Sequence, residues 1–226
     1  MFFVNFSSNG LILQLSQEDQ DRMQLICQPV ALTEGQSLCL SHSADADHVY
    51  FLADACVSLW VQPEQKSQLA ISLIGHEGAV GLGSALGQQP SHLRFEVERS
   101  GNAWRTHSQE LQQLLRKQPA MLWVIARYLW QMTHDIANTA ASVQYDDVQT
   151  RLAAWLYLFA QRSNSLKLNL THEQLARMLG VRRVSITLAA AALRDMGLLS
   201  YKRGSVDILD LNGLTLQAQT KTHQQF

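Results

Sequence analysis

Basic and hydroxyl-bearing side chains with the chemistry to recognise nucleic acid are concentrated between residues 170 and 209. The segment reads LTHEQLARMLGVRRVSITLAAAALRDMGLLSYKRGSVDIL. A guanidinium such as that of Arg183 can donate two parallel hydrogen bonds to a guanine edge, and Lys or Arg side chains also bind phosphate. These contacts require a rigid element that presents the side chains together, so the structure predicted around Arg183 decides whether the chemistry is available.

The first half of this segment predicts a helix-turn-helix. Thr171 followed by Gln174 forms a capping box, in which each side chain accepts an N–H at the start of a helix. Gly180 stands where a left-handed residue ends that helix, and Ala176 is small enough to let a second helix approach closely. Apolar residues recur at helical spacing after Val181 and predict the second helix. The alternative is an ordinary pair of packed helices without a nucleic-acid partner.

The second helix is expected to enter the major groove of double-stranded DNA with its N-terminal residues on base edges. Two short strands around a basic turn follow it and predict a wing. Arg182 breaks one local rule, because it stands where a Ser or Thr would cap the helix. The residues expected to contact bases are Arg183, Val184, Thr187 and Leu188. The residues expected to contact phosphates are Thr171, His172, Arg182, Ser185, Lys202 and Arg203.

A long helix is predicted from Pro119 to about Tyr145, with the proline in its first turn, where the missing N–H does no harm. Its apolar residues recur at alternating spacings of three and four, the heptad pattern of helices that pair with one another. We therefore expect a homodimer through this helix, and the alternative is a helix buried on its own β-domain. Trp123, Tyr128 and Trp130 lie off the heptad seam and are expected to pack onto the β-domain. The seam consists of Leu122, Ile125, Leu129, Met132, Ile136 and Val143, with Thr139 completing the spacing.

Short apolar runs separated by turn-forming residues predict a β-sandwich or barrel between about residues 10 and 110. A glycine-dense stretch from Gly75 to Gly87 implies tight backbone bends within it. The expected strands are Leu38–Leu40, Val49–Leu52, Val57–Val61, Leu69–Ile74 and Phe95–Val97. Further helices are expected at Gln17–Cys27, Ser108–Lys117 and Val148–Gln161.

The charge is distributed unevenly along the chain. The net charge of −1 for 226 residues argues against a nucleic-acid partner when it is taken as a whole. Residues 151–226, however, carry ten basic and four acidic side chains, a net charge of +6, and residues 1–150 carry the compensating excess of acid. The basic part coincides with the predicted helix-turn-helix, so the total conceals a domain suited to a polyanion.

Location and cysteine usage are predicted from simple features. Cys27, Cys39 and Cys56 form no metal-ligand pattern and are expected to be buried as small apolar residues. The longest unbroken apolar run, Leu152–Ala160, is about half of what a membrane-spanning helix needs. The start, MFFVNFSSNG, lacks the basic region and cleavage site of a signal peptide. We expect a cytoplasmic protein with no membrane partner.

Taken together, these features resemble the Crp/Fnr family of bacterial transcription regulators. The resemblance rests on the β-region, the heptad helix, the segment RLAAWL that starts at Arg151, and the winged helix-turn-helix. It implies an α+β fold with an N-terminal jelly-roll β-barrel of the cyclic-nucleotide-binding type. It assigns residues 1–118 to a β-roll sensor domain, 119–147 to a dimerisation helix and 148–226 to a DNA-binding domain. It also implies a palindromic operator, with RNA polymerase as a further partner.

The sequence departs from the family in the recognition helix. Family members commonly present an Arg, an acidic residue and a second Arg there, and the matching residues here are Arg183, Val184 and Leu188. Only the first is kept, so the operator is expected to differ from the usual family consensus.

The sensor region departs as well. Cyclic-nucleotide-binding members supply a Glu for the ribose hydroxyl, and Leu82 stands at that position here. They also supply an Arg-Ser pair for the cyclic phosphate after that Glu, whereas the nearest residues in this chain are Ser91-His92-Leu93-Arg94. A buried phosphate without a guanidinium costs several kcal/mol, so we expect no binding of cAMP in the family manner, no cofactor, and an effector still to be identified. The residues expected at the effector pocket are Gly81, Leu82, His92 and Arg94.

The sequence thus predicts a dimeric, sequence-specific DNA-binding regulator with an effector-sensing β-domain, which is not an enzyme. One alternative is a metal-dependent, cupin-like β-barrel enzyme that would use His42, His48, His76 and Glu77, although no compact H-x-H pattern is present and no metal site is predicted. The other alternative is a protein-interaction module whose C-terminal half docks a protein.

Overall fold

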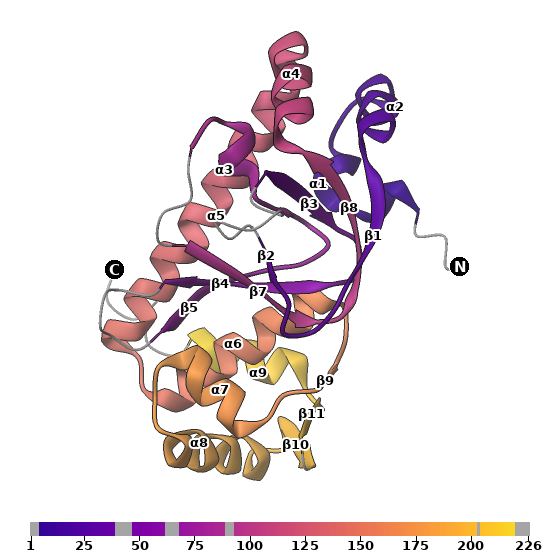
Figure 1. The fold of residues 1–226 in the computed structure, drawn as a ribbon. Helices are drawn as coiled ribbons and strands as arrows, with labels where there is room; N and C mark the ends of the chain where they lie inside the picture. The colour runs from indigo at the N-terminus through magenta and orange to yellow at the C-terminus, as the bar shows by residue number, and fades with distance from the viewer. Residues whose placement is uncertain (1–4, 39–46, 62–67, 89–92, 203, 220–226) are drawn as a thin grey trace. The chain divides into compact units, whose positions relative to one another are not determined.

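The structure is a computed structural model that describes residues 5–38, 47–61, 68–88, 93–202 and 204–219. The chain forms two compact units, one of residues 1–60 and 72–135 and the other of residues 61–71 and 136–226. Figure 1 shows β-strands dominating the N-terminal part of the chain and helices dominating the C-terminal part. The domain limits expected near residues 118 and 148 stay predictions.

The first sheet has the strand order β1-β8-β3-β6, and its pairs are antiparallel. The register of β3 with β8 places His48 opposite His107 and Tyr50 opposite Arg105. All five residues of β3 are buried, which agrees with the apolar run from which this strand was predicted. The strands are β1 (Gln28–Leu32), β3 (His48–Leu52), β6 (Ala79–Val80) and β8 (Gly101–His107).

The second sheet has the order β2-β7-β4-β5. The predicted strands outside β3 fall on this sheet, although Cys39 and Leu40 lie outside the described residues. The two sheets share no strand among the described residues. The fold is therefore jelly-roll-like, as predicted, but the closed barrel is corrected to two sheets. The strands are β2 (Ser37–Leu38), β4 (Cys56–Val61), β5 (Leu69–Ile74) and β7 (Leu93–Arg99).

Short helices complete the first unit, and their apolar residues form one core cluster with Val49 and Phe51 of β3. Asn9 is fully buried: its Oδ1 accepts from Leu11 N and Ile12 N, and its Nδ2 donates to the carbonyls of Leu52 and Gly78 at 2.8 Å. One amide thus joins a helix start to two strand ends. The helices are η1 (Phe6–Ser8), α1 (Gly10–Leu13), α2 (Gln17–Ile26), α3 (Leu82–Ala85) and α4 (Ser108–Lys117).

Two of the three cysteines lie within the described residues, and both Cys27 and Cys56 are buried, as predicted. Burial, with the nearby carboxylate of Glu110, raises the pKa of the Cys27 thiol to about 12. The thiol is therefore neutral and behaves as a small apolar group. Cys39 lies outside the described residues.

Helix α5 (Pro119–Tyr145) has the predicted bounds, and its first turns pack on the first unit. The Tyr128 hydroxyl donates to Ala79 O at 3.2 Å and accepts from Ala79 N at 3.3 Å. Gly78 lies under the Tyr128 ring, where a Cβ atom would collide with it. Tyr128 therefore packs as predicted, but Trp123 and Trp130 are 77% and 75% exposed, and the prediction that they pack on the β-domain was wrong. At 100° per residue they lie on the face of α5 opposite Met121, Val124 and Ile125, which are buried.

In the second unit, α6 packs against α8 and α9, and a small sheet has the order β10-β11-β9. Asp147 caps α6 by accepting from Thr150 N, and Asn164 ends the helix in the left-handed conformation. Trp155 on the buried face of α6 directs its Nε1 at the sulfur of Met178, 3.3 Å away. No helix among the described residues is both long and apolar enough to cross a membrane. The elements are α6 (Val148–Ser163), β9 (Lys167–Leu168), α7 (His172–Leu179), α8 (Arg183–Asp195), β10 (Leu199–Lys202), β11 (Ser205–Ile208) and α9 (Leu211–Gln219).

Candidate nucleic-acid interface

Helix α7 begins with the predicted capping box. Thr171 Oγ1 accepts from Gln174 N at 3.1 Å, and Gln174 Oε1 accepts from Thr171 N at 2.9 Å. The helix ends at Gly180, whose φ of 65° lies in the left-handed region that favours glycine. Val181 N then donates to Ala176 O, which closes the turn into α8. The signals that predicted this helix-turn-helix are therefore all present as geometry.

Helix α8 separates a buried face from an exposed one. Ile186, Ala189, Ala190 and Leu193 are buried, as their spacing predicts. Arg182 is the N-cap residue and makes no side-chain capping bond, which confirms that the first N–H groups of α8 lack a cap. Helix α8 therefore has free donors at the end that is expected to meet DNA.

The four residues expected to contact bases share the exposed face of α8. Val184 and Leu188 are 69% and 68% exposed, although both are apolar, so this face presents uncovered hydrocarbon beside Arg183. Apolar side chains on the surface of a recognition helix suit contact with thymine methyl groups. The helix brings together Arg183, Val184, Thr187 and Leu188.

Arg183 has a charged neighbour on α7. Its Nε lies 4.0 Å from Glu173 Oε2, and both side chains are more than two-thirds exposed. An exposed pair at this distance is worth at most about 1 kcal/mol. Glu173 therefore lies beside Arg183 without burying it, and the Arg183 side chain stays 70% exposed.

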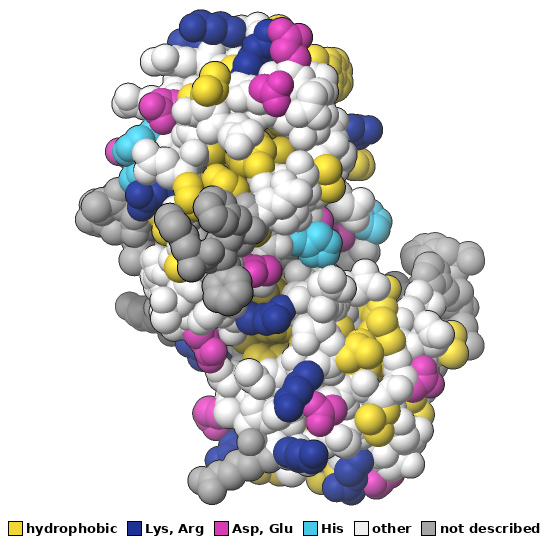
Figure 2. Space-filling model, turned by 90° about the vertical axis from the view of Figure 1, so that its right-hand side faces the viewer, with side chains coloured by type: hydrophobic (Ala, Val, Ile, Leu, Met, Phe, Trp, Pro, Cys, Tyr) yellow, Lys and Arg dark blue, Asp and Glu magenta, His cyan; other side chains and the backbone are white. Residues whose placement is uncertain are grey.

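The residues expected to contact phosphates surround the same face. Arg182 and Lys202 are exposed, and Ser185 is half-buried on α8. The Thr171 hydroxyl lies 2.9 Å from Gln174 Oε1 and donates to it, so a phosphate contact would have to replace this bond. Arg203 lies outside the described residues. Figure 2 shows Lys and Arg side chains gathered on the C-terminal part of the chain, at the bottom of the view.

The predicted wing is an antiparallel hairpin of β10 and β11, to which β9 adds a third strand. Its register pairs Tyr201 with Val206 and Lys202 with Ser205. Gly204 in the turn has a φ of 78°, so the turn uses the left-handed conformation there. Lys202 is thus placed at the tip of the hairpin, where a phosphate contact is expected.

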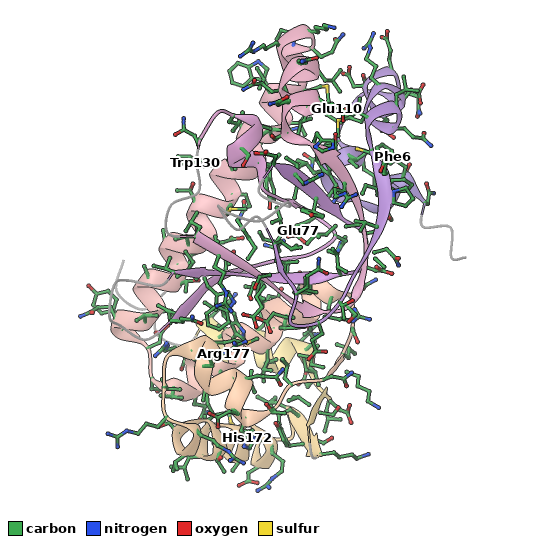
Figure 3. All side chains as sticks on the ribbon, in the orientation of Figure 1. Phe6, Glu77, Glu110, Trp130, His172 and Arg177 are labelled. Carbon is green, nitrogen blue, oxygen red and sulfur yellow. The ribbon has the colours of Figure 1, made fainter. Side chains whose placement is uncertain are left out.

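His172, expected to contact phosphate, is turned into the domain. Its Nδ1 lies 3.0 Å from Thr187 Oγ1, and its ring centroid lies 4.1 Å from that of Tyr201. Figure 3 shows His172 beside α8 and the wing strands. Burial, and then the positive charge of Arg183, lower the pKa of His172 below its ordinary value of 6.5. The ring is therefore neutral at pH 7.

Three residues of this site escaped the sequence reasoning. Glu173 and Tyr201 stand next to predicted contacts, but nothing in their spacing marks their partners. The Arg151 guanidinium donates to the carbonyl of Leu179 near the end of α7, 28 residues further on, and so supports the turn. Only the tertiary fold reveals contacts across such separations.

The residues expected at an effector pocket are only partly brought together. Gly81 has a φ of 86° and precedes α3, while Leu82 is buried in the core cluster of the first unit. Arg94 pairs with Glu96 within β7. His92 lies outside the described residues.

The predicted dimer seam divides into buried and accessible positions. Ile125 is buried and Leu129 packs against the same core, so these two serve the interior of their own unit. Met132 and Ile136 are half-buried, and Leu122 and Val143 are exposed. A second heptad stripe, one residue further along, is exposed throughout. It consists of Trp123, Ala126, Trp130, Thr133, Ala137, Ala140 and Gln144.

The residues weighed for an alternative metal site have other contacts. His48 lies against His107, with ring centroids 4.3 Å apart, and Glu77 accepts from Gly75 N. The described residues contain no group of three or more His, Cys, Asp or Glu side chains arranged to hold a metal ion. His42 lies outside the described residues.

A family model of the Crp-like helix-turn-helix domain matches residues 150–216. These residues are a Crp-like helix-turn-helix domain. The Crp-like domain runs from α6 into α9 and contains both the exposed face of α8 and the wing. No curated protein matches the chain by sequence.

Solved structures with the same fold cover nearly the whole chain. One is a protein from Eubacterium rectale assigned to the Crp/Fnr family of transcriptional regulators, with a TM-score of 0.69, 14% identity, and coverage of 94% of this chain and 99% of that one. Another is the c-di-GMP responsive global regulator CLP of Xanthomonas campestris, with a TM-score of 0.68 and 17% identity, and the match covers 85% of this chain and 99% of that one. A third is a Crp/Fnr-family regulator from Thermus thermophilus, with a TM-score of 0.65 and 19% identity, and the match covers 84% of this chain and 98% of that one.

The domain match and the fold bear on different parts of the prediction. The domain match identifies the Crp-like domain, and the solved structures show that 85–94% of the chain has the fold of Crp/Fnr regulators. The predicted family resemblance, the jelly-roll-like fold and the class, a transcription regulator with a helix-turn-helix DNA-binding domain, are confirmed at this level. That family is one of regulators rather than of enzymes.

Proposed function

We propose that the chain is a homodimeric regulator that binds palindromic double-stranded DNA through α8 and the wing. The observation that carries this proposal is the exposed face of α8, on which Arg183 stands beside two uncovered apolar side chains. A capped α7 and the Gly180 turn support that face from behind. A cytoplasmic location gives the protein access to DNA, and RNA polymerase is the further partner through which bound protein would affect transcription.

Base reading is assigned to the exposed face. Arg183 donates two hydrogen bonds to guanine O6 and N7, a contact worth about 1–3 kcal/mol of discrimination. Val184 lies one residue on and contacts a thymine methyl group. Leu188 follows one helical turn later and extends the apolar contact along the groove. An apolar residue cannot accept a hydrogen bond from cytosine N4, so the operator differs from one read by an acidic residue at the position of Val184.

Phosphate binding is assigned to the rim of that face. The exposed Arg182 and Lys202 supply charge, and Ser185 supplies a hydroxyl. The uncapped N–H groups of α8 add donors, because a helix N-terminus attracts anions. The missing cap costs about 1 kcal/mol in the free protein, and phosphate contact in the complex offsets it.

The dimer interface is assigned to the accessible part of α5. Ile125 is enclosed in its own unit, so it cannot be the centre of a helix-pairing surface. The exposed stripe that contains Trp123 and Trp130 keeps heptad spacing and offers two large aromatic anchors, the residue type enriched at the energetic centres of interfaces. Leu122 and Val143 of the predicted seam border this stripe. We assign the pairing face to the stripe together with these two residues.

The effector of the β-domain is proposed not to be cAMP bound in the family manner. Leu82, at the position of the family's ribose-binding Glu, faces the core and offers no acceptor. Arg94, whose guanidinium was expected near the phosphate position, is already paired with Glu96. A phosphate there would compete with a carboxylate for a single arginine.

Selection of genomic DNA fragments by the purified full-length protein tests this function. We expect recovery of fragments that share one palindrome, with half-sites about 34 Å apart in a dimer that places each α8 in a major groove. A protein-interaction module or a metal-dependent enzyme would enrich no common sequence. Fragments without a shared motif would overturn the proposal.

A further inference from the structure

We propose that His172 and Thr187 position the recognition helix against the wing instead of contacting DNA themselves. The inference rests on the proposed function, because it concerns how α8 is held for base reading. It reassigns two residues that the sequence placed on phosphate and on bases. It makes His172 a positioning residue at the junction of α7, α8 and β10.

The hydrogen-bonding capacity of Thr187 carries the first step. Its hydroxyl has one hydrogen, and Thr187 Oγ1 lies 3.1 Å from Arg183 O, to which it donates. His172 Nδ1 lies 3.0 Å from the same oxygen and must therefore be the donor of the second bond. With its hydrogen committed to Arg183 O and an N–H directed at its oxygen, Thr187 has no donor left for a base edge.

The second step is the contact with the wing. The His172 ring lies against the Tyr201 ring at 4.1 Å with an interplanar angle of 46°. The Tyr201 hydroxyl donates to Leu170 O at 2.8 Å, just before α7 begins. Burial raises the pKa of Tyr201, so the hydroxyl keeps the hydrogen that this bond needs. The imidazole therefore connects the recognition helix to strand β10, while Tyr201 connects β10 to the chain before α7.

The third step concerns the other ring nitrogen. His172 Nε2 is buried and has no hydrogen-bond partner among the described residues. In the tautomer with a hydrogen on Nδ1 it is an acceptor, and an acceptor cannot bind a phosphate oxygen. A phosphate contact would require the buried Nε2 to become exposed and to gain a proton beside Arg183. The exposed Arg182 and Lys202 can contact phosphate at no such cost.

Two substitutions of the same histidine test the positioning role. The Nδ2 of asparagine occupies nearly the place of His172 Nδ1, so His172→Asn can keep the bond to Thr187, whereas glutamine carries its amide one atom further. We expect His172→Gln to weaken operator binding about three- to tenfold, the range of one hydrogen bond, and to leave binding to a scrambled duplex within about twofold. His172→Asn should recover most of the loss.

The salt dependence of binding is the readout that a phosphate contact and a positioning contact do not share. Each phosphate neutralised by a positively charged side chain contributes about 0.9 to the magnitude of the slope of log K against log salt concentration, so a protonated His172 bound to phosphate would contribute to this slope. We expect His172→Gln to keep the slope of the parent protein, whereas Lys202→Ala, the matched control on the wing, should lower it by about that amount. A lowered slope for His172→Gln, with equal loss on both duplexes, would overturn the inference.

A double-mutant cycle with Thr187→Val keeps the test decisive if His172→Gln folds poorly. Valine has nearly the shape of threonine but lacks the oxygen, so the two substitutions together should cost little more than one alone. Additive losses would show that the residues act independently on DNA and would contradict the inference. Absence of any operator preference in the parent protein would instead refute the proposed function, so the two failures are distinguishable.

Discussion

The Nε of Arg183 lies 4.0 Å from Glu173 Oε2, so the side chain assigned to base reading is paired with a carboxylate of its own domain. Both groups are exposed, and this pairing is weak enough to be exchanged for a guanine contact. Glu173 also places a negative charge at the rim of a surface that has to approach phosphates.

Removal of that charge is expected to strengthen DNA binding in general. Glu173→Gln removes a carboxylate that the DNA phosphates repel. It should therefore raise the affinity for operator and scrambled duplexes alike, by about two- to fivefold at low salt. Fluorescence anisotropy titrations on both duplexes measure this. Weaker binding confined to the operator would show instead that Glu173 is needed to orient Arg183.

Helix pairing is expected to depend on Trp130 more than on Ile125. Trp130, labelled on α5 in Figure 3, is exposed, and Trp130→Asp should convert the dimer to a monomer in sedimentation velocity without lowering the melting temperature of the first unit. The control Ile125→Ala removes a buried side chain and should cost about 2–5 kcal/mol of stability. A Trp130→Asp variant that stays dimeric would contradict the assignment.

Acid is expected to weaken the C-terminal domain through His172. Its pKa in the folded domain is lowered below 6.5, so the unfolded chain takes up the proton first. The contribution of neutral His172 to the free energy of unfolding is therefore present above about pH 6.5, and it is lost as the pH falls through the lowered pKa of the folded domain. Urea unfolding of the parent and His172→Gln proteins at about pH 7.5 and 5.5 should show their difference shrinking in acid. A difference that grows in acid would mean that the pKa is raised.

Cyclic AMP at millimolar concentration is expected not to bind the β-domain. Leu82 is buried and Arg94 is engaged with Glu96, so neither the ribose nor the phosphate has its family partner. Isothermal titration calorimetry with cAMP, with c-di-GMP as the comparison ligand, measures this. Heat of binding with cAMP that disappears in Arg94→Ala would show that Arg94 exchanges its carboxylate partner for phosphate.

The helix-turn-helix was predictable because its signals are local. The capping box, Gly180 and the spacing of Ile186, Ala189 and Leu193 all lie within a few residues of the geometry they produce. The strands of the first unit were predicted where apolar runs are continuous. β1 contains Pro29, β6 has two residues and β8 has a polar sequence, so these three give no comparable signal.

Contacts between distant residues were not predictable in the same way. The heptad spacing predicted the length of α5 correctly, but spacing alone cannot say which face of the helix the β-domain covers. Ile125, predicted on the dimer seam, is buried in its own unit, and Trp130, predicted to pack on the β-domain, is exposed. Likewise, nothing in the neighbourhood of His172 marks Tyr201, 29 residues later, as the ring it packs against. Both outcomes depend on tertiary packing.

The central claim is that α8 reads DNA sequence through Arg183. The most direct measurement compares the parent, Arg183→Ala and Lys202→Ala proteins on a selected operator and on a scrambled duplex. Arg183→Ala should lose about 1–3 kcal/mol on the operator and little on the scrambled duplex. Lys202→Ala should lose equal binding free energy on the operator and on the scrambled duplex. Equal losses for Arg183→Ala on the two duplexes would contradict the account.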